Sequence, residues 1–201
     1  MLAMMLEVRG TRVVVIGAGK VGLRKAEAVL KAGAFVVLVD PKPEISAMRF
    51  VYVHEEYREE HLHGFQLVIA AVSREINERI VADAKRLGIL VCDTSLPTRG
   101  NFIFPAVHTV GDLTIAVSTG GISPGFAKAI RDELAEDYDE DYSTFLHLLR
   151  EMRAAVHEKY PSSADRKAAC NQLGTYEWFE QFQKRGKDAT RSEMLDWLRR
   201  N

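Results

Sequence analysis

Short runs of consecutive apolar residues alternate with longer amphipathic stretches through the first half of the chain. Apolar runs that end in turn residues are typical of strands buried on both faces of a parallel sheet, and apolar residues at helical spacing indicate helices. The predicted strands span residues 13–16, 35–39, 50–53, 67–72 and 89–92, and the predicted helices span 21–31 and 77–87. This alternation predicts an α/β fold with a doubly wound parallel sheet.

The pattern changes after Asp93. Two apolar runs, 102–110 and 113–119, are separated by only Gly111 and Asp112. Runs joined by such a short turn predict an antiparallel hairpin that lies outside the parallel sheet. Proline lacks an amide hydrogen, so Pro105 confines part of the first run to an edge or a bulge.

From Ser123 onward the apolar spacing is helical. Ser123 can cap a helix whose first residue is Pro124, and a long helix around residues 145–160 precedes shorter ones. The chain is therefore expected in three parts. They are a sheet-and-helix domain over 1–110, a hairpin-containing region over 111–142 and a helical domain over 143–201.

Composition narrows the class of protein without naming a function. The chain has 201 residues, is 47% hydrophobic and 27% charged, and carries a formal net charge of −1, with no basic stripe. Nucleic-acid-binding proteins usually have a basic excess, and a membrane span needs about 20 apolar residues. Cys92 and Cys170 fit neither a disulfide scaffold nor a metal-ligand spacing. We expect a cytoplasmic protein without nucleic-acid or membrane partners.

Residues 17–22 read Gly-Ala-Gly-Lys-Val-Gly between a predicted strand and a predicted helix. In such a turn Gly17 permits the tight bend, Gly19 lets a pyrophosphate approach the backbone, and Gly22 permits close helix–sheet packing. Asp40 follows the second strand, where a carboxylate binds a ribose diol and repels a 2′-phosphate. The pattern predicts a Rossmann-type domain that prefers NAD to NADP. A glycine turn without a dinucleotide is the weaker alternative.

A second ligand is expected beyond the carboxyl ends of the strands, where open parallel sheets bind their ligands. Asp93 and Ser95 follow the fifth predicted strand, and if that strand continues, strand alternation puts both on one face. As catalytic residues, Asp93 could move a proton and Ser95 could orient a substrate group or a water molecule. Asp93 could equally serve only to cap the strand end.

A second glycine-rich turn leads into the helix that follows Ser123. Backbone amides at a helix N-terminus suit an anionic group such as a substrate carboxylate, although a simple capped helix start is the plainer interpretation. The candidate residues of this turn are Ser118, Thr119, Gly120 and Gly121. None of the six histidines has a partner at a clear metal-ligand spacing, so any metal site stays unknown.

Six segments carry a family resemblance, namely 6–10, 13–22, 24–26, 69–72, 101–106 and 116–124. Together they resemble the precorrin-2 dehydrogenases, which also form the N-terminal half of siroheme synthases. The resemblance extends over about residues 4–160. The Phe-Ile-x-Pro and Gly-Gly-x-Ser-Pro segments make it specific, because they are unusual together in Rossmann proteins.

The resemblance implies NAD-dependent oxidation of precorrin-2, a tetrapyrrole, to sirohydrochlorin on the route to sirohaem. It implies a homodimer in which the Rossmann domain is followed by a dimerisation region and a C-terminal helical domain. Substrate contacts are expected at Asn101 and in the turn 118–121. Cofactor contacts beside the glycine turn and just past the second strand are expected at Lys20, Val21, Pro41 and Lys42.

One departure from the family concerns ferrous iron. Members that also act as ferrochelatases carry an aspartate two residues before the proline that matches Pro97, and this chain has Ser95 there. Ferrochelatase activity is therefore left open, with Asp93 as the candidate substitute. The competing functional class is an NAD-sensing regulatory module without catalysis. Segments 102–107 and 118–124 favour the enzyme.

Overall fold

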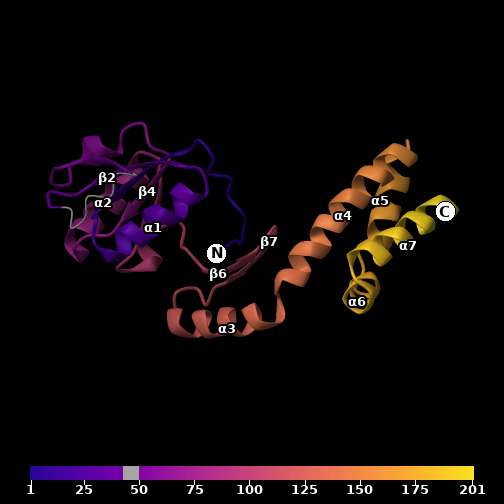
Figure 1. Ribbon diagram of the computed structural model, residues 1–201. Helices are drawn as coiled ribbons and strands as arrows, with labels where there is room; N and C mark the ends of the chain where they lie inside the picture. The colour runs from indigo at the N-terminus through magenta and orange to yellow at the C-terminus, as the bar shows by residue number, and fades with distance from the viewer. Residues whose placement is uncertain (43–49) are drawn as a thin grey trace. The chain divides into compact units, whose positions relative to one another are not determined.

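The structure, a computed structural model, describes residues 1–42 and 50–201. Its contacts divide the chain into two compact units, Met1–Phe104 and Pro105–Asn201 (Figure 1). The predicted parts 1–110, 111–142 and 143–201 were assigned by the expected roles of cofactor binding, dimerisation and a helical domain. That assignment stays a prediction.

The first unit contains a parallel sheet of five strands in the order β3-β2-β1-β4-β5. The strands are β1 (Arg12–Ile16), β2 (Phe35–Val39), β3 (Val51–Val53), β4 (Leu67–Ala70) and β5 (Leu90–Asp93). The helices are α1 (Lys20–Lys31) and α2 (Arg74–Arg86), with short 3-10 turns η1 (Glu59–Leu62) and η2 (Pro97–Arg99). The chain proceeds outward from β1 to β3 and then adds β4 and β5 on the other side of β1. This arrangement confirms the predicted Rossmann-type doubly wound sheet.

Helices cover both faces of this sheet. Val14 of β1 belongs to one buried cluster with Ile80 of α2, whereas the next residue, Val15, belongs to a second cluster with Ala26 of α1. Because successive side chains of a strand point to opposite faces, α1 and α2 lie on opposite faces of the sheet. This double burial explains why the strands are continuous apolar runs.

The ends of some elements differ from the sequence prediction for local reasons. Helix α2 begins at Arg74 rather than at residue 77, because the Ser73 hydroxyl caps it by accepting a hydrogen bond from the Ile76 amide at 3.4 Å. The apolar run that begins at residue 102 forms a strand only from Ala106, directly after Pro105.

The second unit begins with an antiparallel hairpin, β6 (Ala106–Val110) and β7 (Leu113–Val117). Gly111 in its turn has a φ of +53°, which favours glycine. Helix α3 (Pro124–Asp137) follows, capped by the Ser123 hydroxyl, which accepts a hydrogen bond from the Phe126 amide at 3.3 Å. The predicted hairpin and helix start are confirmed.

Four more helices complete the second unit (Figure 1). They are α4 (Glu140–Lys159), α5 (Ser163–Leu173), α6 (Tyr176–Arg185) and α7 (Lys187–Arg200). Their apolar faces form one buried cluster that includes Leu148, Met152, Phe179 and Met194. The predicted helical C-terminal part is confirmed. Within the part of the chain that the structure describes, no helix is long and apolar enough to cross a membrane.

Candidate active site

The glycine turn between β1 and α1 has the form that a pyrophosphate needs. Gly17 has a φ of +103°, and a Cβ there would lie 2.3 Å from the Ala71 carbonyl oxygen. A Cβ on Gly22 would lie 1.9 Å from the Gly17 carbonyl oxygen. A Cβ on Gly19 would meet no atom within 4 Å, so this glycine faces open space. The first and third glycines are thus required by packing, and Gly19 leaves room for a ligand.

The N-terminus of α1 is suited to an anion. Gly19 is its N-cap, no side chain caps the helix, and its first turn holds no acidic residue. Backbone amides at such a terminus attract phosphate groups. Lys20 and Val21 follow in the exposed first turn, so the residues present fit a dinucleotide phosphate.

Asp40 lies at the end of β2 beside this turn. Its Oδ2 accepts a hydrogen bond of 2.7 Å from the Ala18 amide, and its Oδ1 accepts one of 2.7 Å from the Lys42 amide. A carboxylate has about four lone-pair positions, so these two hydrogen bonds do not use all of its capacity to accept. Asp40 can therefore hold the glycine turn and bind a ribose at the same time. Pro41 and Lys42 follow at exposed positions.

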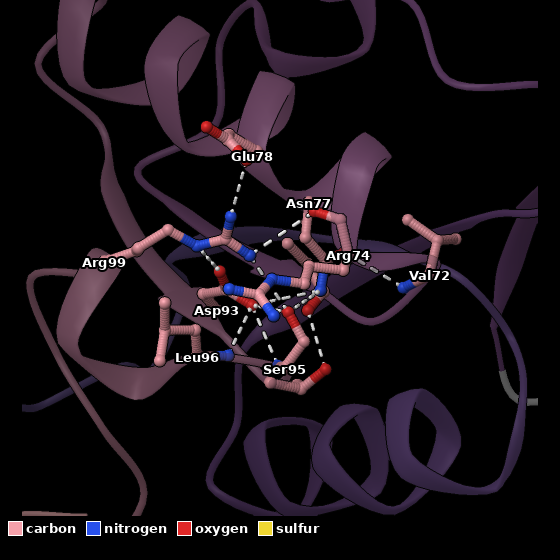
Figure 2. Close-up of polar contacts among 10 residues, drawn as sticks. Val72, Arg74, Asn77, Glu78, Asp93, Ser95, Leu96 and Arg99 are labelled. Carbon is pink, nitrogen blue, oxygen red and sulfur yellow. Dashed lines mark hydrogen bonds and ion pairs between the residues drawn. The ribbon is translucent and has the colours of Figure 1, made fainter.

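A polar network joins the loops after β4 and β5 (Figure 2). The Asp93 side chain is buried at its centre, with an exposed fraction of 0%. Its Oδ1 accepts hydrogen bonds from the Ser95 hydroxyl at 2.7 Å and from the Ser95 and Leu96 amides at 2.8 and 3.2 Å. Asn77 Nδ2 donates to the same oxygen at 3.0 Å.

Arg99 completes the network from η2. Its Nε donates to Asp93 Oδ2 at 2.8 Å, and its terminal nitrogens bond Ser95 Oγ at 3.1 Å and Glu78 Oε2 at 2.9 Å. Burial alone would raise the pKa of Asp93. The hydrogen bonds from Ser95, Leu96 and Asn77 outweigh burial and lower that pKa below its usual value.

The structure thus brings the predicted pair Asp93 and Ser95 into direct contact. Asp93 is held as a carboxylate by five hydrogen bonds. The Ser95 hydroxyl donates to Asp93 and accepts from Asn77 and Arg99. A carboxylate whose two oxygens both accept hydrogen bonds and whose pKa is lowered is better suited to holding a loop than to accepting a proton.

The candidate substrate residues belong to different units. Asn101, in the first unit, accepts a hydrogen bond from the Val91 amide at 2.7 Å through its side chain, so it holds the edge of β5. The turn 118–121 belongs to the second unit and precedes α3. Within it the Thr119 hydroxyl accepts from the Ser123 amide at 3.0 Å, and Gly120 and Gly121 have positive φ values.

Sequence reasoning missed two members of the network, Asn77 and Arg99. Asn77 is 0% exposed and lies on the inner face of α2 with Ile80, Val81 and Ala84. A polar residue in an apolar helical stripe is a usable signal, because a buried amide needs partners. Arg99 carried no comparable signal, since only the folded loop places it beside Asp93.

Residues 1–42 and 50–201 contain no group of three or more His, Cys, Asp or Glu side chains that could hold a metal ion.

Comparison with known proteins agrees with this geometry. Residues 4–106 match the family model described as NAD(P)-binding, and residues 110–136 match the model described as the central part of sirohaem biosynthesis proteins. The precorrin-2 dehydrogenase of Priestia megaterium is 29% identical over 164 residues, which cover 78% of this chain and 81% of that protein.

Longer relatives match over the same region. A siroheme synthase of Pseudomonas fluorescens is 35% identical over 80% of this chain, and siroheme synthase 2 of Aeromonas salmonicida is 33% identical over 83%. The aligned region spans 36% of the length of each. Among solved structures, the precorrin-2 dehydrogenase SirC superposes with a TM-score of 0.77 over the whole of both chains at 24% identity, which establishes a shared fold.

Proposed function

The chain belongs to the NAD(P)-binding family that residues 4–106 match, and from this premise we propose that it is an NAD-dependent dehydrogenase that oxidises precorrin-2 to sirohydrochlorin. The observation that carries the proposal is the order of the two family matches, with a sirohaem-specific segment at 110–136 directly after the dinucleotide domain. A relative of similar length is itself named precorrin-2 dehydrogenase.

The proposed cofactor site comprises the glycine turn, the first turn of α1 and the end of β2. Gly19 and the uncapped α1 terminus would hold the pyrophosphate, and Asp40 would hold the adenosine ribose. The bound NAD supplies the hydride acceptor. Because the Asp40 carboxylate lies beside the glycine turn, where the adenosine ribose would bind, it would repel a 2′-phosphate, and NAD is expected to bind well ahead of NADP.

For Asp93 and Ser95 we propose a role in holding the loop after β5 against the substrate. The geometry supports this role better than the proton transfer that the sequence suggests, because every Asp93 oxygen is engaged. Asp93→Ala should lower turnover by about 10²-fold or more through misplacement of the loop. NAD affinity should barely change, since the cofactor contacts lie elsewhere. Full activity in Asp93→Ala would end this assignment.

We also propose how the protein assembles and where it works. Several apolar side chains of the hairpin and α3 are exposed, among them Val107 at 41% and Phe126 at 62%, which supports a homodimer that covers them. Two free cysteines, Cys92 and Cys170, suit the reducing cytoplasm. Iron insertion into sirohydrochlorin is expected to be weak, because Ser95 stands where bifunctional relatives carry a carboxylate.

The decisive experiment incubates the protein anaerobically with precorrin-2 and NAD and follows the absorption spectrum for sirohydrochlorin. The expected result is conversion that requires NAD. Gly19→Ala serves as a matched variant, since its Cβ meets no protein atom yet fills the space for the pyrophosphate. It should keep the fold and lose at least about tenfold in NAD affinity. NAD binding without turnover in the parent protein would instead favour a regulatory module.

A further inference from the structure

The side chain of Asn77 links two loops that lie at the same end of the sheet (Figure 2). Its Oδ1 accepts a hydrogen bond from the Val72 amide at 3.1 Å, in the loop after β4. Its Nδ2 donates to Asp93 Oδ1 at 3.0 Å and to Ser95 Oγ at 3.3 Å, in the loop after β5. The residue is 0% exposed, so water cannot replace these bonds without a change in the fold.

The loop on the Val72 side lies against the glycine turn. A Cβ built on Gly17 would lie 2.9 Å from Val72 Cγ1 and 2.3 Å from the Ala71 carbonyl oxygen. The Ala71 amide in turn bonds the Ile16 carbonyl at 2.8 Å. The position of this loop is therefore fixed relative to the turn that would hold the cofactor phosphates.

The chemistry of this position specifies asparagine. The side chain must accept from a backbone amide on one side and donate to a carboxylate on the other, which a primary amide can do without a charge. The charged side chains of the network around it include Asp93 on β5, Arg99 on η2, and Arg74 and Glu78 on α2 (Figure 2). A carboxylate at position 77 would face Asp93 without a proton to donate, and an apolar residue would leave Val72 and Asp93 each short of a partner.

We propose that Asn77 is a positioning residue for the dehydrogenation, which holds the loop carrying Asp93 and Ser95 in register with the cofactor turn. This inference rests on the proposed function. Asn77 acts through the two loops and contacts neither ligand directly. Its loss should therefore lower kcat and leave NAD affinity nearly unchanged.

The test compares Asn77→Ala with Tyr57→Phe. The Tyr57 hydroxyl donates to Asp83, also on α2, at 2.9 Å, so the control removes a hydrogen bond to the same helix about two turns away. Asn77→Ala should lower kcat about 10²-fold with the KM for NAD changed less than about threefold, as expected for misplaced reacting groups. Tyr57→Phe should keep the parental kcat.

Asn77→Asp supplies a readout that a purely structural role would not give. At neutral pH the introduced carboxylate repels Asp93, whereas the same group in its protonated form can accept from Val72 and donate to Asp93. The kcat of this variant relative to the parent should rise as the pH falls from about 8 to about 5. A constant ratio across this range, or parental kcat in Asn77→Ala, overturns the inference.

Hydrogen exchange separates this inference from the proposed function. In Asn77→Ala the amides of Val72, Ser95 and Leu96 should exchange faster together, and in Tyr57→Phe they should not. Unchanged exchange at these amides overturns the coupling of the two loops, whatever the activity. Absence of precorrin-2 oxidation in the parent protein overturns the proposed function, and the exchange data still decide whether Asn77 couples the loops.

Discussion

At the scale of single residues, Asp93 and Ser95 share a 2.7 Å hydrogen bond that turns both side chains toward each other. Every polar atom of the pair has a protein partner, and Arg99 balances the buried charge. Such a closed network stabilises one loop conformation and gives the loop after β5 its shape. The carboxylate charge is needed for that, because all its contacts are donors.

Asp93→Asn should lower the free energy of unfolding of the first unit by about 1–3 kcal/mol at pH 7, since one buried acceptor is replaced by a donor. The lowered pKa of Asp93 sets the pH dependence. Ionised Asp93 stabilises the fold fully above its pKa in the unfolded chain, which is about 4. This stabilisation is lost as the pH falls through the lower pKa that Asp93 has in the folded protein. Urea unfolding at pH 7 and at about pH 3 should therefore give a difference in stability between Asp93→Asn and the parent that shrinks at the lower pH.

Asp112→Asn, which breaks an exposed ion pair with Arg150, is the control and should change the free energy of unfolding by less than about 1 kcal/mol.

Ser95→Asp should place a second carboxylate against Asp93, with Arg99 as their shared cation. Two adjacent carboxylates repel each other when both are ionised, and this repulsion raises the pKa of the pair. The variant should therefore lose stability as the pH rises toward 8 and regain it near pH 4. Because bifunctional relatives carry a carboxylate at this position, Ser95→Asp should insert iron into sirohydrochlorin faster than the parent does. Separate assays of dehydrogenation and chelation test this, and parental chelation in a folded variant contradicts it.

What the sequence predicts at this scale depends on whether a residue acts locally. The glycine turn and the place of Asp40 beside it were predictable, because they follow from a fixed spacing along one strand–turn–helix unit. Strand alternation predicted a shared face for Asp93 and Ser95 only if the fifth strand continued, and β5 ends at Asp93. Their contact arises in the turn after the strand, where the Ser95 amide and hydroxyl both donate to Asp93 Oδ1. The partners Asn77 and Arg99 are 16 residues before and six residues after Asp93, and only tertiary packing brings them together.

At the scale of elements, the hairpin turn is packed against the long helix of the second unit. A Cβ on Gly111 would lie 2.0 Å from Ser143 Oγ of α4, and the residue has a positive φ. Whether a segment forms a strand or a helix was predictable, because continuous apolar runs mark the strands and apolar residues at helical spacing mark the helices. Their ends were less so, since they depend on a cap such as Ser73 or on the missing amide of Pro105.

Gly111→Ala should therefore destabilise the second unit by more than the roughly 1 kcal/mol expected from backbone strain alone. Gly120→Ala is the matched control, because Gly120 also has a positive φ but a Cβ there meets no atom within 4 Å. Thermal unfolding of the two variants isolates the clash with Ser143. Equal losses would mean that the hairpin turn adjusts without cost to α4.

At the scale of the whole molecule, the exposed apolar side chains of α3 and the hairpin bear on assembly. Within α3 only Ala127 is buried, although Phe126, Ile130 and Leu134 share one face. An amphipathic helix whose apolar face is only partly covered by its own hairpin, with Phe126 left 62% exposed, is typical of an interface. The apolar spacing of α3 was predictable from the sequence. The surface that packs against its apolar face was not, because that depends on tertiary and subunit contacts.

Phe126→Glu should convert the proposed dimer to a monomer, because a charge at a buried interface position lacks a partner. Light scattering after gel filtration measures the mass directly. Leu87→Glu, at the end of α2 and 37% exposed in the parent, is the control and should leave the mass unchanged. A parent protein that is monomeric at working concentration contradicts the proposal at once.

The separation of the buried clusters has a calorimetric consequence. Two of the described clusters lie wholly in Met1–Phe104 and the third lies wholly in Pro105–Asn201. Each unit then has its own enthalpy of melting, and the van't Hoff enthalpy of the whole chain should fall short of the calorimetric one. Saturating NAD, at about 100 times its Kd, adds about 2.7 kcal/mol to the first unit only and moves one endotherm away from the other. A single melting temperature would then describe neither half of the chain.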